Sequence, residues 1–161
     1  MTPQTLPPVV QMLQMLHGLH LTSCLSCLAT LGVPDLVEHG PKSAEELAAQ
    51  IGANPQALYR LMRLTASIGV LSEGPDGKFS ETPLSAVLRS NARPTVRGYA
   101  MLGIREFHMR GWERLEYSVR TGKTALDDVY GMSTFEYIFS HPEEMNVFNA
   151  AMTELSMMDS P

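Results

Sequence analysis

Four side chains that can bind zinc lie close together near the N-terminus: His17, His20, Cys24 and Cys27. At 100° per residue they fall within about 80° of arc on one face of a helix. They also span about 15 Å of that helix, whereas a zinc ligand lies ~2.0–2.3 Å from the metal. One straight helix cannot bring all four to a single ion. Packing at a helix interface explains them more simply, since a free cysteine behaves as a small hydrophobic residue, and we expect no metal site.

Two arginines suggest a different chemistry. Arg60 and Arg63 lie on a predicted helix, residues 55–68, which a predicted hairpin follows. Helix, helix and hairpin in this order predict a winged helix-turn-helix, a fold that can bind DNA through a basic helix and a basic wing. The wing segment 73–78 carries Glu73, Asp76 and Lys78 and is net acidic. Phosphate contacts need more positive charge, so a DNA-binding transcriptional regulator is the alternative function.

The composition is that of one ordinary globular domain with little charge. The chain has 161 residues, of which 44% are hydrophobic and 18% charged, and its net charge is −5. A charged share below the usual ~25% indicates surface that a partner covers. The negative charge argues against non-specific binding to nucleic acid.

Residues 1–34 contain no Asp, Glu, Lys or Arg. A secretory signal needs a basic segment, which is absent. Gln11, Gln14 and Ser26 are among the polar residues that interrupt the apolar run, which argues against a membrane span. A helix that is apolar most of the way round must be covered by protein instead. Two cysteines without a secretion signal indicate a reducing compartment, and we expect a cytoplasmic protein.

Start and stop signals divide the first half into helices and one hairpin. Pro7 and Pro8 open an apolar helical segment that Gly18 divides in two and that Gly32 ends. Residues 43–46, Ser-Ala-Glu-Glu, form a capping box that starts the next helix. Asn54 followed by Pro55 starts the helix after it. The face at helical spacing in that helix comprises Leu58, Leu61, Met62, Thr65 and Ile68.

The rest of the chain is predicted to be mainly helical. Residues 70–73 and 78–81 flank a Gly-Pro-Asp-Gly turn and read as the hairpin, and a helix follows over 84–88. Residues 94–120 are expected to be mostly helical, and 121–123 form a loop. A short helix is expected over 134–139 and an amphipathic one over 143–158, with Met145, Phe148, Met152 and Leu155 on one face.

Two long segments resemble a known family. Residues 46–90 are similar to the winged-helix segment of bacterial and plant small-molecule O-methyltransferases, and residues 112–156 resemble the helices that join that segment to the catalytic domain. The best-matching stretches are Tyr59-Arg-Leu-Met-Arg63, Trp112 with Ser118-Val-Arg-Thr-Gly122, and Phe148-Asn-Ala-Ala-Met152. The resemblance runs from about Leu19 to the C-terminus.

The resemblance implies a mainly α fold in one domain, 1–161. Its parts would be N-terminal dimerisation helices (7–40), a winged helix-turn-helix with a small β-hairpin (41–90) and C-terminal linker helices (91–161). In the family a Rossmann-type domain follows, which binds S-adenosylmethionine through a Gly-rich loop. The twelve glycines here never occur as Gly-x-Gly, and no βαβ pattern is present. We therefore expect that the catalytic domain is missing, that the chain binds no cofactor, and that alone it is inactive.

The resemblance also implies which residues touch a substrate. In the family, the matching helices form one wall of a pocket for an aromatic or polyketide-like molecule, and residues aligned with Phe148 and Met152 commonly contact it. Helical spacing by itself favours the alternative that these two side chains belong to the core. Methionine and aromatic side chains suit flat, apolar ligands. The sequence near His108 shows no carboxylate and nucleophile that could form a catalytic triad with it. No catalytic residue is therefore predicted. The expected substrate-binding set is Met101, His108, Trp112, Phe135, Phe148, Asn149 and Met152.

The charge-free N-terminal segment predicts a homodimer through residues 9–33. Exposing all its leucines in a monomer would create an unusually large apolar patch. Obligate interfaces are large, apolar and poor in charge at their centre. The family resemblance agrees, because these enzymes commonly intertwine N-terminal helices. The leucines concerned are Leu13, Leu16, Leu19, Leu25 and Leu28.

Overall fold

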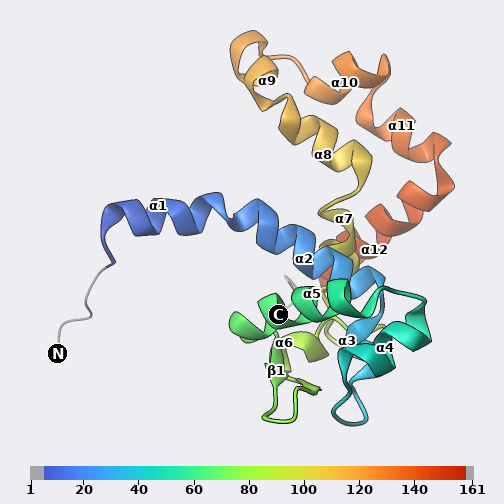
Figure 1. Cartoon of the computed structure of the whole chain (residues 1–161). Helices are drawn as coiled ribbons and strands as arrows, with labels where there is room; N and C mark the ends of the chain where they lie inside the picture. The colour runs from blue at the N-terminus through green and yellow to red at the C-terminus, as the bar shows by residue number, and fades with distance from the viewer. Residues whose placement is uncertain (1–5, 159–161) are drawn as a thin grey trace.

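The structure, a computed structural model, describes residues 6–158. These residues are mainly helical and carry one two-stranded antiparallel sheet, as the sequence predicts (Figure 1). The elements are α1 Pro8–Leu16, α2 Gly18–Thr30, α3 Val33–Leu36, α4 Ala44–Ile51, α5 Pro55–Ser67, β1 Leu71–Glu73, β2 Phe79–Glu81, α6 Pro83–Ala86, α7 Arg97–Leu102, α8 Glu106–Glu113, α9 Leu115–Thr121, α10 Ala125–Tyr130, α11 Thr134–Ser140 and α12 Pro142–Met158.

The predicted local signals at the start of α4 and α5 are confirmed. The Ser43 hydroxyl accepts a hydrogen bond from the Glu46 N–H at 3.2 Å, and the Glu46 carboxylate accepts the Ser43 N–H at 2.7 Å. Asn54 Oδ1 accepts the Ala57 N–H at 3.0 Å. Each bond satisfies a backbone donor that the first helical turn would leave unpaired.

The main core lies among α2 to α6 and the hairpin. Phe79 from β2, Leu47 from α4 and Met62 from α5 are completely buried there. Strands β1 and β2 pair with Leu71 opposite Glu81, a register that turns Leu71 and Phe79 into the core. A second, smaller cluster comprises Leu102, Phe107, Ile138 and Ala151.

Helix α1 projects away from the rest of the molecule (Figure 1). It contains no buried residue. Its side chains Val9, Met15 and Leu16 are 67%, 71% and 64% exposed. The C-terminal end of the predicted 9–33 interface is not exposed in this way. Leu28 and Val33 are fully buried in the chain's own core. Within residues 9–33, the apolar surface open to a partner is therefore concentrated on α1 and the start of α2.

Several element boundaries differ from the sequence-based expectation. Residues 94–120 are mostly helical, as expected, and form three helices, because the backbone leaves helical geometry between α7 and α8 and again at Arg114, where φ is −105° and ψ is 20°. The helix expected over 84–88 ends at Ala86, and α10 was not predicted. Ile68 is 40% exposed rather than on the buried face, because it follows the last turn of α5, where helical spacing no longer applies.

No helix among the described residues is long and apolar enough to cross a membrane.

Candidate functional site

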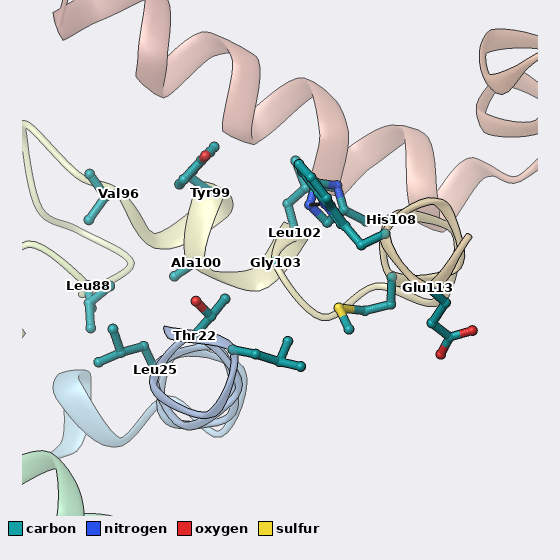
Figure 2. A pocket seen from close by; sticks show the side chains of 13 residues that line it. Thr22, Leu25, Leu88, Val96, Tyr99, Ala100, Leu102, Gly103, His108 and Glu113 are labelled. Atoms are coloured by element: carbon teal, nitrogen blue, oxygen red, sulfur yellow. Dashed lines mark hydrogen bonds between the residues drawn. The ribbon is translucent and has the colours of Figure 1, made fainter. Parts of the chain in front are cut away.

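A cavity of about 670 Å³ lies where α2, α7 and α8 meet (Figure 2). This volume is within the range of small-molecule sites, which are mostly apolar with a few polar groups. Most of the lining side chains here are aliphatic or aromatic. The lining residues are Leu19, Thr22, Leu25, Leu88, Val96, Tyr99, Ala100, Leu102, Gly103, His108, Met109, Trp112 and Glu113.

Helical spacing explains which residues face the cavity. In α2, positions 19, 22 and 25 recur every three residues and share one face. In α8, positions 108 and 112 lie one turn apart, as do 109 and 113, so all four belong to one stripe. Helix α7 packs against α2 and contributes Tyr99, Ala100 and Leu102. Figure 2 shows Thr22 on α2 directed toward α7.

Two contacts fix α7 as the floor of the cavity. The carboxylate of Glu154 on α12 accepts the backbone N–H groups of Gly98 and Tyr99 at 2.8 and 2.9 Å, which caps the N-terminus of α7. At the other end, a Cβ on Gly103 would lie 2.8 Å from Thr22 Cγ2. The missing side chain at residue 103 therefore permits the close approach of α7 to α2.

An ion pair sets the position of α8. Arg105, the residue that precedes α8, donates through Nε to Glu144 Oε2 at 2.6 Å, and its second nitrogen also binds that carboxylate. Glu144 lies on α12 and is only 8% exposed. Bidentate arginine–carboxylate pairs fix orientation as well as distance. Helix α12 thus anchors both α7 and the start of α8.

Two rings one turn apart on α8 place hydrogen-bonding groups in the cavity wall. Trp112 Nε1 donates a hydrogen bond to His108 Nε2 at 3.0 Å. The ring centroids are 6.1 Å apart, and Phe107 meets His108 edge-on at 6.4 Å. Burial lowers the pKa of His108 from its ordinary value, because the charged imidazolium loses hydration. The indole donor and the lowered pKa both favour a neutral imidazole.

A second aromatic group lies between α11 and α12. Phe135 meets Phe148 edge-on, with centroids 6.2 Å apart, and Phe139 lies 6.1 Å from Phe135. Phe148 and Met152 pack on the smaller core cluster. Phe135 and Phe139 are nevertheless 58% and 66% exposed.

The four residues of the metal hypothesis do not form a metal site. The rings of His17 and His20 are 5.8 Å apart at the junction of α1 and α2. Cys24 and Cys27 are unbridged, and they line a groove between α2 and α5. Within residues 6–158 there is no group of three or more His, Cys, Asp or Glu that could hold a metal ion.

The arginines of the DNA-binding alternative are exposed on α5. In the hairpin, the Glu73 carboxylate accepts a hydrogen bond from Tyr59, and Lys78 lies 4.0 Å from Glu46. The hairpin's lysine therefore faces an acidic neighbour, and the arrangement adds no basic surface to Arg60 and Arg63.

Residues 13–91 match the family model described as the O-methyltransferase dimerisation domain. The chain belongs to this family. Phenazine O-methyltransferase PhzM from Lysobacter antibioticus is 44% identical over 121 residues, which are 75% of this chain and 35% of the relative. A mitomycin biosynthesis 6-O-methyltransferase from Streptomyces lavendulae is 38% identical, over 81% of this chain and 38% of the relative.

Solved structures agree with the dimerisation-domain assignment. LaPhzM superposes with a TM-score of 0.88 at 41% sequence identity. The superposed region is 94% of this chain and 45% of the LaPhzM chain. The dimethyltransferase RosA from Streptomyces davawensis gives a TM-score of 0.86 at 28% identity, over 95% of this chain and 46% of that one. The chain thus spans a little over a third of the length of the curated relatives, which are 35% and 38% covered.

The structure does not gather the predicted substrate-binding residues of this dimerisation-domain protein in one place. His108 and Trp112 line the large cavity. Asn149 and Met152 line a shallow groove on α12. Met101 lies on α7 without lining the cavity, and its carbonyl accepts the Ser26 hydroxyl at 3.5 Å.

Sequence reasoning missed part of the cavity wall. Met109 and Glu113 share the stripe of His108 and Trp112, so helical spacing would have found them. Tyr99 and Thr22 carry no such signal, because their neighbours in the cavity come from distant segments of the chain. Leu19 and Leu25, which were singled out as interface leucines, also line the cavity.

Proposed function

We propose that this chain is the dimerisation and substrate-binding part of an S-adenosylmethionine-dependent O-methyltransferase that acts on a hydroxyl of an aromatic or polyketide-like molecule. The match of residues 13–91 to the dimerisation domain carries the proposal. The relatives are named for phenazine and mitomycin methylation. A structure that is 28% identical, with a TM-score of 0.70, is described as an O-methyltransferase in complex with S-adenosylmethionine and 2-hydroxy-5-methyl naphthoic acid.

The shape and chemistry of the cavity support the substrate part of this proposal. Its volume of about 670 Å³ is sufficient for a molecule of a few fused rings. Trp112 and Tyr99 offer flat apolar faces, and Met109 is an adaptable neighbour. We assign His108 and Trp112 to substrate contact at this cavity.

The remaining predicted substrate-binding residues are proposed to extend the wall of the substrate pocket toward α12. They are Met101, Phe135, Phe148, Asn149 and Met152.

The described residues do not fit S-adenosylmethionine. A Rossmann-type cofactor site needs parallel strands that each lead into a helix through a Gly-rich loop. The sheet within residues 6–158 has two antiparallel strands joined by a turn. We therefore assign recognition and assembly to these residues and no cofactor contact. Calorimetry with up to about 1 mM S-adenosylmethionine, the weak end of useful affinity, should show no binding, and micromolar binding would contradict this assignment.

Assembly is proposed to use α1 and the start of α2. Helix α1 carries no charged residue and leaves Met12, Leu13 and Leu16 56%, 49% and 64% exposed. An apolar helix that projects from a soluble protein indicates a surface covered by protein. A second copy of the chain is the occupant that the dimerisation-domain match supports.

Sedimentation equilibrium tests this assembly. The wild-type chain, 17.7 kDa per copy, should sediment as a dimer at micromolar concentration. Leu16→Glu should yield monomers or aggregates, because a charge would be buried against apolar surface. Leu84→Glu is the matched control, since Leu84 is 55% exposed on α6, outside α1. Monomeric wild type, or equal effects of the two substitutions, would reject the interface.

A further inference from the structure

The hydrogen bond between Trp112 and His108 determines where the imidazole carries its proton. An indole N–H can donate a hydrogen bond and cannot accept one. Because Trp112 Nε1 lies 3.0 Å from His108 Nε2, that nitrogen must be the acceptor. The imidazole is then neutral, with its proton on Nδ1. One hydrogen-bond donor, the Nδ1–H, remains on a side chain that lines the cavity.

The surroundings of His108 keep it in this form. Burial beside Phe107 lowers the pKa of His108, so the neutral ring persists at pH 7. No protein group among the described residues hydrogen-bonds to Nδ1, and burial alone, with no carboxylate, accounts for the lowered pKa of this histidine. Among the described residues, Trp112 is the hydrogen-bond partner of the imidazole, through Nε2. A bound molecule could therefore accept the hydrogen bond that Nδ1–H has to donate.

The other polar groups of the cavity are engaged differently. The Thr22 hydroxyl donates to the Gly18 carbonyl at 2.9 Å and retains only its acceptor capacity. The Glu113 carboxylate, also an acceptor, binds Arg110 at 3.2 Å. His108 and the rotatable hydroxyl of Tyr99 are therefore the donors that the lining offers to a ligand.

We propose that the His108–Trp112 pair selects flat aromatic molecules that present a hydrogen-bond acceptor, such as a carbonyl, ether or ring nitrogen, to His108 Nδ1–H. Trp112 is the positioning residue, because it fixes the tautomer. The inference rests on the proposed function and adds to it the chemical class of the substrate: an aromatic ring system with an acceptor near its edge.

Two bicyclic probes separate acceptor recognition from apolar binding. Quinoline has a ring nitrogen that only accepts hydrogen bonds and is neutral at pH 7.5, whereas indole has a ring N–H that only donates. Dissociation constants come from amide chemical-shift titrations of the complete 161-residue chain. The decisive quantity is the ratio of the two constants, because a change in wall area alone affects both flat probes alike.

Substitution of His108 should change that ratio. His108→Phe keeps a ring and removes the donor, so it should weaken quinoline binding about fivefold, equivalent to about 1 kcal/mol, and change indole binding less than about twofold. His108→Gln retains an amide donor and should restore part of the preference. His39→Phe makes the same chemical change at a side chain that is 87% exposed outside the cavity, and should leave both constants unchanged.

The tautomer itself provides a readout independent of binding. Imidazole nitrogen-15 shifts of wild-type His108 should show an unprotonated Nε2 and a protonated Nδ1. Trp112→Phe removes the indole donor and should shift the population toward the Nε2–H tautomer, with a smaller quinoline preference. A purely structural role for Trp112 would leave the tautomer unchanged.

The outcomes distinguish the two levels of the proposal. Saturable binding of both probes at the cavity, with an unchanged ratio in His108→Phe, overturns the acceptor selectivity and leaves the proposed substrate site intact. Binding of neither probe at millimolar concentration, or shifts confined to residues away from the cavity, rejects the cavity as an aromatic site and with it that part of the proposed function. Well-dispersed amide spectra confirm that each variant is folded.

Discussion

The two halves of the chain bury their apolar side chains to different extents. From α2 to the hairpin, large side chains such as Phe79 and Met62 are 0% exposed and form one core. From α8 to α11, Trp112, Phe135 and Phe139 remain 60%, 58% and 66% exposed. The first half thus stabilises itself internally, whereas the second keeps apolar surface available, which in soluble proteins indicates binding. Stability and recognition are therefore expected to respond to substitutions in different places.

The largest contrast is expected between two phenylalanines. Phe79→Ala removes a completely buried ring from the main core and should lower the free energy of unfolding by about 3–5 kcal/mol. Phe139→Ala, at a ring that is 66% exposed, should change it by less than about 0.5 kcal/mol. Urea denaturation followed by circular dichroism measures both. Comparable losses would show that the second half is as tightly packed as the first.

Replacing Gly98 tests how α7 is held against α12, and Gly18 in α2 provides the comparison. A Cβ on Gly98 would lie 2.9 Å from the Ala150 Cβ and 3.0 Å from backbone atoms of α12, so Gly98→Ala should separate α7 from α12 and cost about 1–3 kcal/mol. Gly18→Ala meets nothing within 4 Å and should stabilise the chain by up to about 1 kcal/mol through helix propensity. Thermal unfolding gives the comparison, and a neutral Gly98→Ala would mean that α12 does not hold α7 in place.

The smallest effect concerns the junction between the halves. The Asp35 carboxylate accepts hydrogen bonds at 2.8 Å from the backbone N–H and the hydroxyl of Ser90, and it binds Arg97 at 2.8 Å. Burial by itself raises the pKa of Asp35, but the bonds from Ser90 and Arg97 lower the pKa overall. We expect Asp35→Asn to cost about 1–2 kcal/mol at pH 7, since hydrogen bonds to charged groups are among the stronger ones.

The pH dependence of the Asp35 contribution follows from its lowered pKa. A carboxylate with a lowered folded-state pKa stabilises the protein above its unfolded value of about 3.9, and the contribution is lost as the pH falls through the folded value. Wild type should therefore lose this stability below about pH 4, and Asp35→Asn should lose less. Asp127→Asn, at an exposed position, is the control. Parallel pH profiles for wild type and Asp35→Asn would contradict the role of this carboxylate.

Local signals determined much of the first half from sequence alone. The capping box at Ser43, the cap at Asn54 and the Gly-Pro-Asp-Gly turn act over a few residues, so their outcome does not depend on distant contacts. The buried faces of α5 followed helical spacing for the same reason, up to the end of the helix at Ser67. Weak local signals explain why the sequence did not divide 94–120 into separate helices and did not predict α10, since these short helices have few side-chain caps.

The sequence by itself also placed the apolar, charge-free segment at the N-terminus and included His108 and Trp112 among the expected substrate-binding residues. Only the tertiary structure decided that Leu28 belongs to the chain's own core and that Leu19 and Leu25 join His108 at one cavity. The reason is physical: spacing fixes which side chains share a helix face, whereas the neighbour of that face depends on how helices cross. Here Gly103 permits the crossing of α2 and α7, and Glu154 on α12 holds the N-terminus of α7; no periodic pattern marks either residue.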